Sequence, residues 1–213
     1  KTFVQVPGCE QSTAERIREI ASDATRKLTK HHRLTQPSQH RQLDYHVSRN
    51  IYAALHSFVF PHLQRILAAP EDRLTKAIRS YAAVEELVAA IPGAEGRGLG
   101  RVDVSSCSDL LADIDHKITP HEKIACIDEA HLALQRCVEE SARAAKRPQD
   151  GSSSPVEMTG DDVLSLFILA VHRSSLRQRL AHVAHVEMYL QGAAGRSGSS
   201  EAARFEEAGY AVS

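Results

Sequence analysis

Two adjacent carboxylates, Asp161 and Asp162, are the residues of this sequence whose types and position most readily suggest chemistry. They follow Thr159 and Gly160 and lie just ahead of the most apolar segment of the chain, Ser165 to Val171. A threonine followed three residues later by a carboxylate is typical of a helix start, so we expect a helix to begin here. A carboxylate at that position either stabilises the helix dipole or is held out toward a cation of a partner.

A pair of histidines offers a second possible chemistry, because His182 and His185 are about one helical turn apart and could bind a metal. No further ligand lies at a suitable spacing, so we interpret them as solvated surface histidines. A metal-dependent hydrolase that uses Asp161, Asp162 and a histidine is a further hypothesis, but the spacing supplies no converging third ligand. We therefore expect neither a metal site nor a cofactor.

The composition of the 213-residue chain is typical of an all-α protein. Its apolar fraction is 42%, with no Trp and only five Tyr and five Phe, and the abundant Ala and Leu favour helix. The formal charge of -1 gives no electrostatic indication of nucleic acid or of an anionic membrane as a partner. The four cysteines contain no Cys-x-x-Cys pair, which fits reduced cytosolic thiols.

The longest apolar runs and the start of the sequence bear on membrane insertion and on whether the chain is a fragment. No stretch reaches the length that crossing a membrane requires. The chain opens on Lys1 without a signal-peptide pattern, and we therefore expect it to be a fragment of a longer protein.

Apolar residues at helical spacing predict a layered bundle of seven or eight helices with no convincing strand. The first helix is expected over residues 13–29 with Ser12 as its cap, and the polar residues 30–42 are interpreted as a linker. Pro61 is expected to kink or restart the following helix, because proline lacks an amide donor and clashes with the preceding turn. Pro120, preceded by a threonine cap, marks the clearest helix start.

The apolar segment from Val163 to Val171 is short enough to be a buried strand. The helix-start pattern before it and the lack of strand partners favour a fully buried helix instead. We expect four of its aliphatic and aromatic residues to belong to the core, although some could line a groove for a partner: Val163, Leu164, Phe167 and Ile168.

Three blocks of sequence, taken in order, resemble the Vps-nine domain (vacuolar protein sorting nine) family. Residues 47–61 are similar to the family's opening helix, and residues 118–127 are close to its Pro-x-x-Lys-Leu-x-x-Ile motif. Residues 161–164, followed by Gly209-Tyr210, are similar to its Ala-Asp-Asp-Leu-Leu-Pro … Gly-Tyr-Tyr signature. The resemblance covers about four-fifths of the chain. It implies an all-α exchange domain over residues 45–213, truncated at its C-terminus, preceded by an N-terminal helix and linker over residues 1–44.

The resemblance also implies a function. Members of the family are guanine nucleotide exchange factors for early-endosomal, Rab-five-type GTPases, and they act without covalent chemistry of their own. We accordingly expect the partner to be a Rab GTPase, bound preferentially in its nucleotide-free form. The protein would be cytoplasmic and peripheral to early endosomes, with membrane recruitment through regions outside this chain.

The family's functional residues map onto a small set of positions here. Asp161 aligns with an aspartate finger that competes with the nucleotide phosphates for the P-loop lysine of the GTPase, and Tyr210 aligns with a tyrosine that contacts the GTPase. Asp162 would reach back to cap its own helix. The residues expected to support the contact with the GTPase are Asp162, Val163, Ser165 and Ser213.

The sequence departs from the family pattern at three places. Ser165 stands where the family has proline, Ala211 replaces its second aromatic residue, and Ser174-Ser175-Leu176 replaces its Asn-Pro-Pro turn. These departures motivate an alternative function, in which the chain is a non-catalytic Rab-binding or scaffold module of the same fold.

Overall fold

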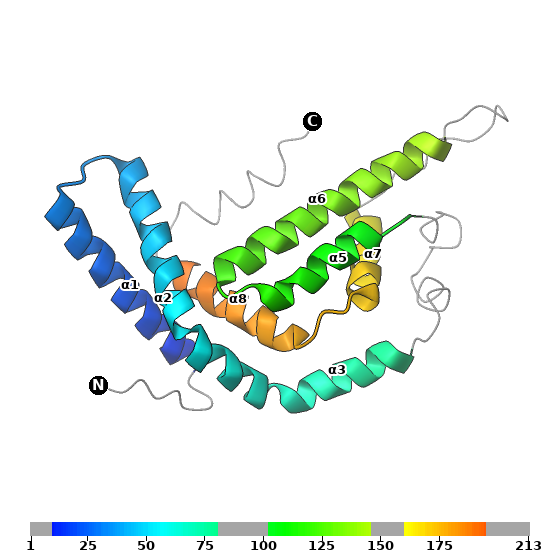
Figure 1. Ribbon diagram of the computed structural model, residues 1–213, viewed down its shortest axis with the longest axis horizontal. Coiled ribbons are helices and arrows are strands. Elements are labelled where there is room, and N and C mark those ends of the chain that lie inside the picture. Colours follow the sequence, from blue (N-terminus) through cyan, green and yellow to red (C-terminus); the bar gives the residue numbers. More distant parts are fainter. Residues whose placement is uncertain (1–9, 81–101, 146–159, 195–213) are drawn as a thin grey trace. The chain divides into compact units, whose positions relative to one another are not determined.

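The computed structural model describes residues 10–80, 102–145 and 160–194 (Figure 1). Within these ranges the secondary structure consists of seven α-helices and one short 3-10 helix, with no strand. The expected all-α class and the helix count close to seven or eight are therefore confirmed. None of the described helices combines the length and the apolar character that membrane crossing requires.

The chain separates into two compact units, each of which is described here by itself. Unit 1 comprises Lys1–Leu67, Ile118–His121 and Leu180–Ser213, and unit 2 comprises Ala68–Lys117 and Glu122–Arg179.

Unit 1 is built on a helical hairpin. Helices α1 (Glu10–His32) and α2 (Pro37–Ile66) lie side by side, joined by a short turn (Figure 1). Helix α8 (Arg179–Ala194) packs on α2, and Tyr52 donates a hydrogen bond from its hydroxyl to the carbonyl of Met188 at 3.4 Å. The buried core residues of unit 1 are Ala14, Ile17, Tyr52, Val59, Phe60, Leu63, Ala181 and Met188.

The structure corrects the expected boundaries in this region. Helix α1 begins at Glu10 rather than after Ser12 and continues to His32, so the interpretation of residues 30–42 as a linker is wrong. Helix α2 already starts at Pro37, whose fixed φ suits the first helical position, and Gln36 donates its backbone N–H to the Gln39 side chain. The polar stretch is helical because it continues two helices whose other ends are buried.

The helix does not restart at Pro61, which lies inside α2 and is exposed. Val59 and Phe60 before it and Leu63 after it are buried in the core of unit 1. We attribute the uninterrupted helix to this packing on both sides, which offsets the one backbone hydrogen bond that proline removes.

Unit 2 contains the remaining helices. They are α3 (Ala68–Ser80), α5 (Ser105–Ala112), the 3-10 helix η2 (Asp113–His116), α6 (Pro120–Ala145) and α7 (Gly160–Arg173). Helix α6 starts at Pro120, as predicted, although its first two residues are grouped with unit 1. Helix α5 begins at Ser105, with Val104 at the cap position.

The core of unit 2 is formed mainly by α5, α6 and α7. Its buried residues are Val102, Val104, Cys107, Leu111, Ile114, Cys126, Ala130, Leu134, Leu166, Leu169, Ala170 and Leu176. Hydrogen bonds add to this packing: Ser108 Oγ lies 3.0 Å from the carbonyl oxygens of Val104 and Ala170, which ties α5 to α7. His172 Nε2 donates to the carbonyl of Ile78 at 3.0 Å, which ties α7 to α3.

Helix α7 is helical, as expected, but it is not fully buried. Leu166 and Leu169 face the core, whereas Leu164 is 60% exposed and Ile168 is 52% exposed. The expectation that Leu164 and Ile168 are core residues is therefore wrong. Val163 and Phe167 are half-buried and pack against the edge of the core. The two faces of α7 are both apolar, and only one of them is covered by the described residues.

The two faces of α7 predict opposite responses to the same substitution. Leu166→Ala leaves a cavity in a packed core and should lower the free energy of unfolding by about 2–5 kcal/mol. Leu164→Ala, two residues earlier on the exposed face, is the matched control and should change it by less than about 0.5 kcal/mol. Denaturant unfolding followed by circular dichroism measures both, and equal losses for the two variants would contradict this orientation of α7.

Candidate functional site

The two carboxylates at the start of α7 have opposite environments. Asp161 is exposed, whereas Asp162 is 1% exposed. Both belong to the first helical turn, where the helix dipole favours negative charge. Within the described part of the chain, the Asp161 carboxylate makes no hydrogen bond or ion pair, while Asp162 does take part in polar interactions. Asp161 is thus the carboxylate that a partner molecule can reach.

An apolar strip continues from Asp161 along the same face of α7. Leu164 and Ile168 are three and seven residues beyond Asp161, and this spacing places all three on one side of a helix. Large apolar side chains that are exposed next to one another often mark a surface that binds another protein. The site therefore combines a negative charge at a helix end with an apolar surface, and this combination suits binding of another protein.

Ser165 lies between the two apolar residues in the sequence and bonds to the first turn of α7. Its Oγ donates a hydrogen bond to the backbone carbonyl of Asp161 at 2.8 Å. The bond involves the main chain of Asp161, so the carboxylate of that residue stays available. The serine at the position of the family's proline thus bonds to the main chain of Asp161 and leaves its carboxylate exposed.

The other end of α7 is also held by serine. Ser174 donates its hydroxyl to the carbonyl of Val171 at 2.8 Å and its backbone N–H to the carbonyl of Ala170 at 2.9 Å. Leu176, which follows, is buried in the core of unit 2. The Ser174-Ser175-Leu176 sequence thus ends the helix and returns the chain to the core, although it contains neither proline of the family pattern.

A buried lysine lies in the first turn of α6, in the same unit as α7. Lys123 is fully buried, and removal from water lowers its pKa to about 7, while the nearby charge of Asp115 acts in the opposite direction. The two Asp115 carboxylate oxygens accept the backbone N–H of Arg177 at 3.3 and 3.2 Å. The sequence placed Lys123 in a family motif but gave no sign of its burial, since lysine is usually exposed.

Several residues of the predicted site lie outside the described residues. These are Gly209, Tyr210, Ala211 and Ser213, together with Thr159, the expected cap of α7. Among the supporting residues that the structure does describe, Val163 and Ser165 are half-buried and Asp162 is buried. The burial of Asp162 is compatible with the expected capping role and leaves little surface for direct contact with a partner.

His182 and His185 are not solvated surface residues, contrary to expectation. Both are buried among aromatic rings of unit 1, with His185 centred 5.9 Å from Tyr52 and 5.7 Å from Phe60. Helix α8 is apolar on most sides, and the imidazoles fill positions against α2 that larger apolar residues commonly occupy. Among the described residues, no group of His, Cys, Asp and Glu is arranged to hold a metal ion.

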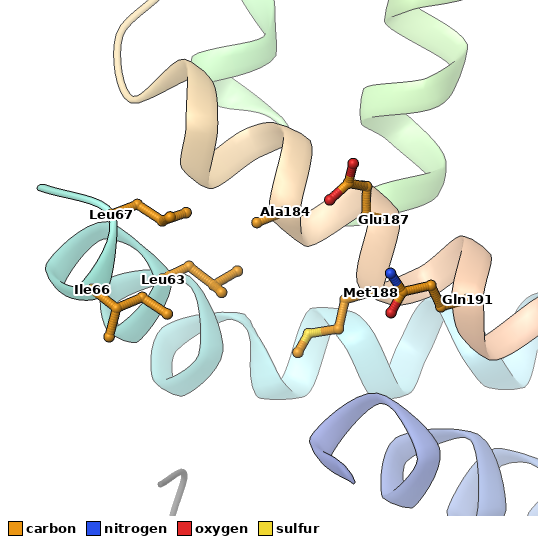
Figure 2. A pocket seen from close by; sticks show the side chains of 7 residues that line it. All are labelled: Leu63, Ile66, Leu67, Ala184, Glu187, Met188 and Gln191. Atoms are coloured by element: carbon orange, nitrogen blue, oxygen red, sulfur yellow. The ribbon is translucent and has the colours of Figure 1, made fainter. Parts of the chain in front are cut away.

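Unit 1 also contains a cavity of about 330 Å³ between the end of α2 and helix α8 (Figure 2). Figure 2 shows Leu67 on the α2 side pointing toward Ala184 of α8. Apolar side chains line most of the cavity, and Glu187 and Gln191 add polar groups. None of the predicted site residues lines it: the lining comprises Leu63, Ile66, Leu67, Ala184, Glu187, Met188 and Gln191.

Comparison with known proteins decides the family. The Vacuolar sorting protein 9 (VPS9) domain model matches residues 104–213, which is more than half of the chain. The chain belongs to the VPS9 domain family. The match begins at the cap of α5 and includes α6, α7 and α8, so both carboxylates of α7 lie inside the VPS9 domain. Neither a curated protein nor a solved structure matches the chain.

Membership of the VPS9 family implies guanine nucleotide exchange on a small GTPase. The matched residues include the second and third blocks singled out in the sequence, but the block at residues 47–61 lies before them. The acidic helix start and the exposed apolar strip of α7 are therefore features of the VPS9 domain proper.

The buried Lys123 predicts a dependence of stability on pH. Its pKa is about 7 in the folded protein and about 10.4 when unfolded, so the unfolded state binds more protons between these values. The free energy of unfolding should consequently rise with pH above 7, by at most about 1.4 kcal/mol per pH unit from this group. Lys123→Met should remove that contribution, as measured by denaturant unfolding at a series of pH values.

The effect of Lys123 is the difference in pH dependence of the free energy of unfolding between the unaltered chain and Lys123→Met. Burial raises the pKa of the thiols of Cys107, Cys126 and Cys137, and this acts against stability at alkaline pH in both proteins alike. A slope against pH that is the same with and without Lys123 would show that the lysine keeps its ordinary pKa.

Proposed function

We propose that this VPS9 domain is an exchange factor for a Rab GTPase of the early-endosomal, Rab-five type, and that Asp161 acts as its aspartate finger. The observation that carries the proposal is the exposure of Asp161 at the start of a helix whose opposite face is locked into the core of unit 2. The early-endosomal location and the preference for nucleotide-free Rab belong to the same proposal.

The mechanism follows from how a GTPase holds its nucleotide. A P-loop lysine and a magnesium ion neutralise the phosphates, so a carboxylate brought to the same place can pair with the lysine and repel the phosphates. Asp161 carries such a carboxylate, and this carboxylate makes no hydrogen bond or ion pair among the described residues. By linkage, tighter binding to the nucleotide-free GTPase weakens nucleotide affinity by the same factor.

The rigidity of α7 supports this use of Asp161. Leu166 and Leu169 are buried on the far side of the helix, and Ser165 holds the carbonyl of Asp161 itself. A charge that is already positioned loses little conformational freedom when it meets its target. Leu164 and Ile168 would add apolar contact with the GTPase surface, and Tyr210 stays a predicted contact.

Removing the Asp161 carboxylate tests the mechanism. Asp161→Ala should slow the release of a fluorescent GDP analogue from a responsive Rab by about tenfold or more, because the charge that competes with the phosphates is lost. Asp161→Asn, which keeps the shape, should be nearly as slow. Asp128→Ala, at an exposed aspartate of α6, is the matched control and should keep the normal rate.

Release should be measured on a small panel of purified Rab GTPases, with helicity checked by circular dichroism. A normal rate for Asp161→Ala would reject the aspartate finger. Binding to a Rab without faster release by the unaltered chain would instead support the alternative function, a non-catalytic Rab-binding module.

The apolar strip predicts a different kinetic effect. Leu164→Ala combined with Ile168→Ala should raise the concentration of the VPS9 domain needed for half-maximal exchange by about tenfold, with little change in the maximal rate. The reason is that contact area is lost while the charge remains. Phe58→Ala, at an exposed aromatic residue of α2, is the control and should leave both quantities unchanged. A fall in maximal rate alone would contradict a binding role.

A further inference from the structure

The net charge of the chain conceals an uneven distribution. Residues 24–43, hereafter the basic tip, contain no Asp or Glu, and they carry five cationic side chains and three histidines. The cationic residues are Arg26, Lys27, Lys30, Arg33 and Arg41, and the histidines are His31, His32 and His40. Since the whole chain has a formal charge of -1, the basic tip contributes +5 and the rest of the chain -6.

The fold gathers these charges at one place. The basic tip comprises the end of α1, the turn and the start of α2, which together form the closed end of the hairpin in unit 1 (Figure 1). No residue between 22 and 51 is buried. Arg26 and Lys27 pair with Asp23, whereas Lys30, Arg33 and Arg41 are exposed and make no ion pair within the part of the chain that the structure describes.

Only some of the cations in the basic tip stabilise the helix ends near which they lie. Cations in the last turn of α1 are favourable because they face the negative end of the helix dipole, and Lys30 is placed in that way. The start of α2 is different, because a helix N-terminus favours anions. Its first turn nevertheless contains no acidic residue, and His40 and Arg41 follow directly. The positive charge near this end therefore gives α2 no stabilisation through its dipole, and an external anion would neutralise it.

We propose that the basic tip binds an anionic lipid membrane surface. The closed end of a hairpin projects its charges outward, which suits a broad negative surface. Single-stranded nucleic acid is a poorer match, because residues 24–43 contain no Phe, Tyr or Trp on which a base could stack. Leu28 and Pro37 are exposed among the cations and supply apolar contact with the lipid interface. This surface is independent of the exchange chemistry proposed for Asp161.

Cosedimentation with vesicles tests the proposal. The full chain should bind vesicles of phosphatidylcholine that contain about one-third phosphatidylserine, and it should not bind vesicles of phosphatidylcholine alone. Each Lys or Arg near such a surface strengthens binding by about fivefold, so the combined variant Lys30→Gln, Arg33→Gln and Arg41→Gln should bind about a hundredfold more weakly. Binding of the unaltered chain should also weaken as salt rises.

A control with the same change of charge separates this surface from a general effect. Arg65, Lys76 and Arg79 are exposed outside the basic tip, and their replacement by Gln should leave vesicle binding within about twofold. Circular dichroism establishes that both variants stay helical. The proposal is overturned if both variants lose binding equally, if neither does, or if the chain binds duplex DNA or RNA but not the acidic vesicles.

Discussion

The structure of the site depends on which way α7 is turned. Successive residues of a helix point about 100° apart, so fixing one face fixes all others. Leu166, Leu169 and Ala170 are fully buried in the core of unit 2, and Ser108 bonds the carbonyl of Ala170. Once these residues are inside, Asp161 must lie outside. Packing of α7 thus decides that Asp161 is exposed and Asp162 is buried. The same packing exposes an apolar surface that a partner would bury.

Unit 2 combines this apolar core with polar groups that are expensive to bury. Lys123 and Asp162 are both out of contact with water, and a buried charge is tolerated only with suitable partners. Such groups contribute little net stability compared with apolar residues of the same size. We infer that their value lies in specificity, because an alternative packing of α6 and α7 would have to satisfy both groups. We regard this as the reason why an exchange domain with a small core can still hold one exposed carboxylate in a defined position.

How much of the fold was predictable depended on whether the signal was local. Pro120 and the residues beside it specify a helix start through their own chemistry, and this prediction was confirmed. The polar residues 30–42 lack an apolar stripe, and their helical structure was therefore not predicted. These residues are helical because α1 and α2 are packed farther along their length. For the site, the sequence pointed to Asp161, but the exposure of Leu164 and Ile168 was hidden because both faces of α7 are apolar. Tyr210 stays a prediction.

The turn between α1 and α2 has a consequence for how the chain behaves as a polyelectrolyte. Residues 33–36 are the whole connection, and Arg33 adopts a positive φ of 50°, which reverses the chain at once. Had the thirteen residues 30–42 been a flexible coil, their ends would have been roughly 20 Å apart, which is beyond the distance of about 8 Å over which physiological salt screens charges. In the hairpin the same charges lie close together and share one ion atmosphere. When one of them binds a multivalent anion, the others are held near it at a high effective concentration. A single tight turn thus converts a dispersed charge into a cooperative one.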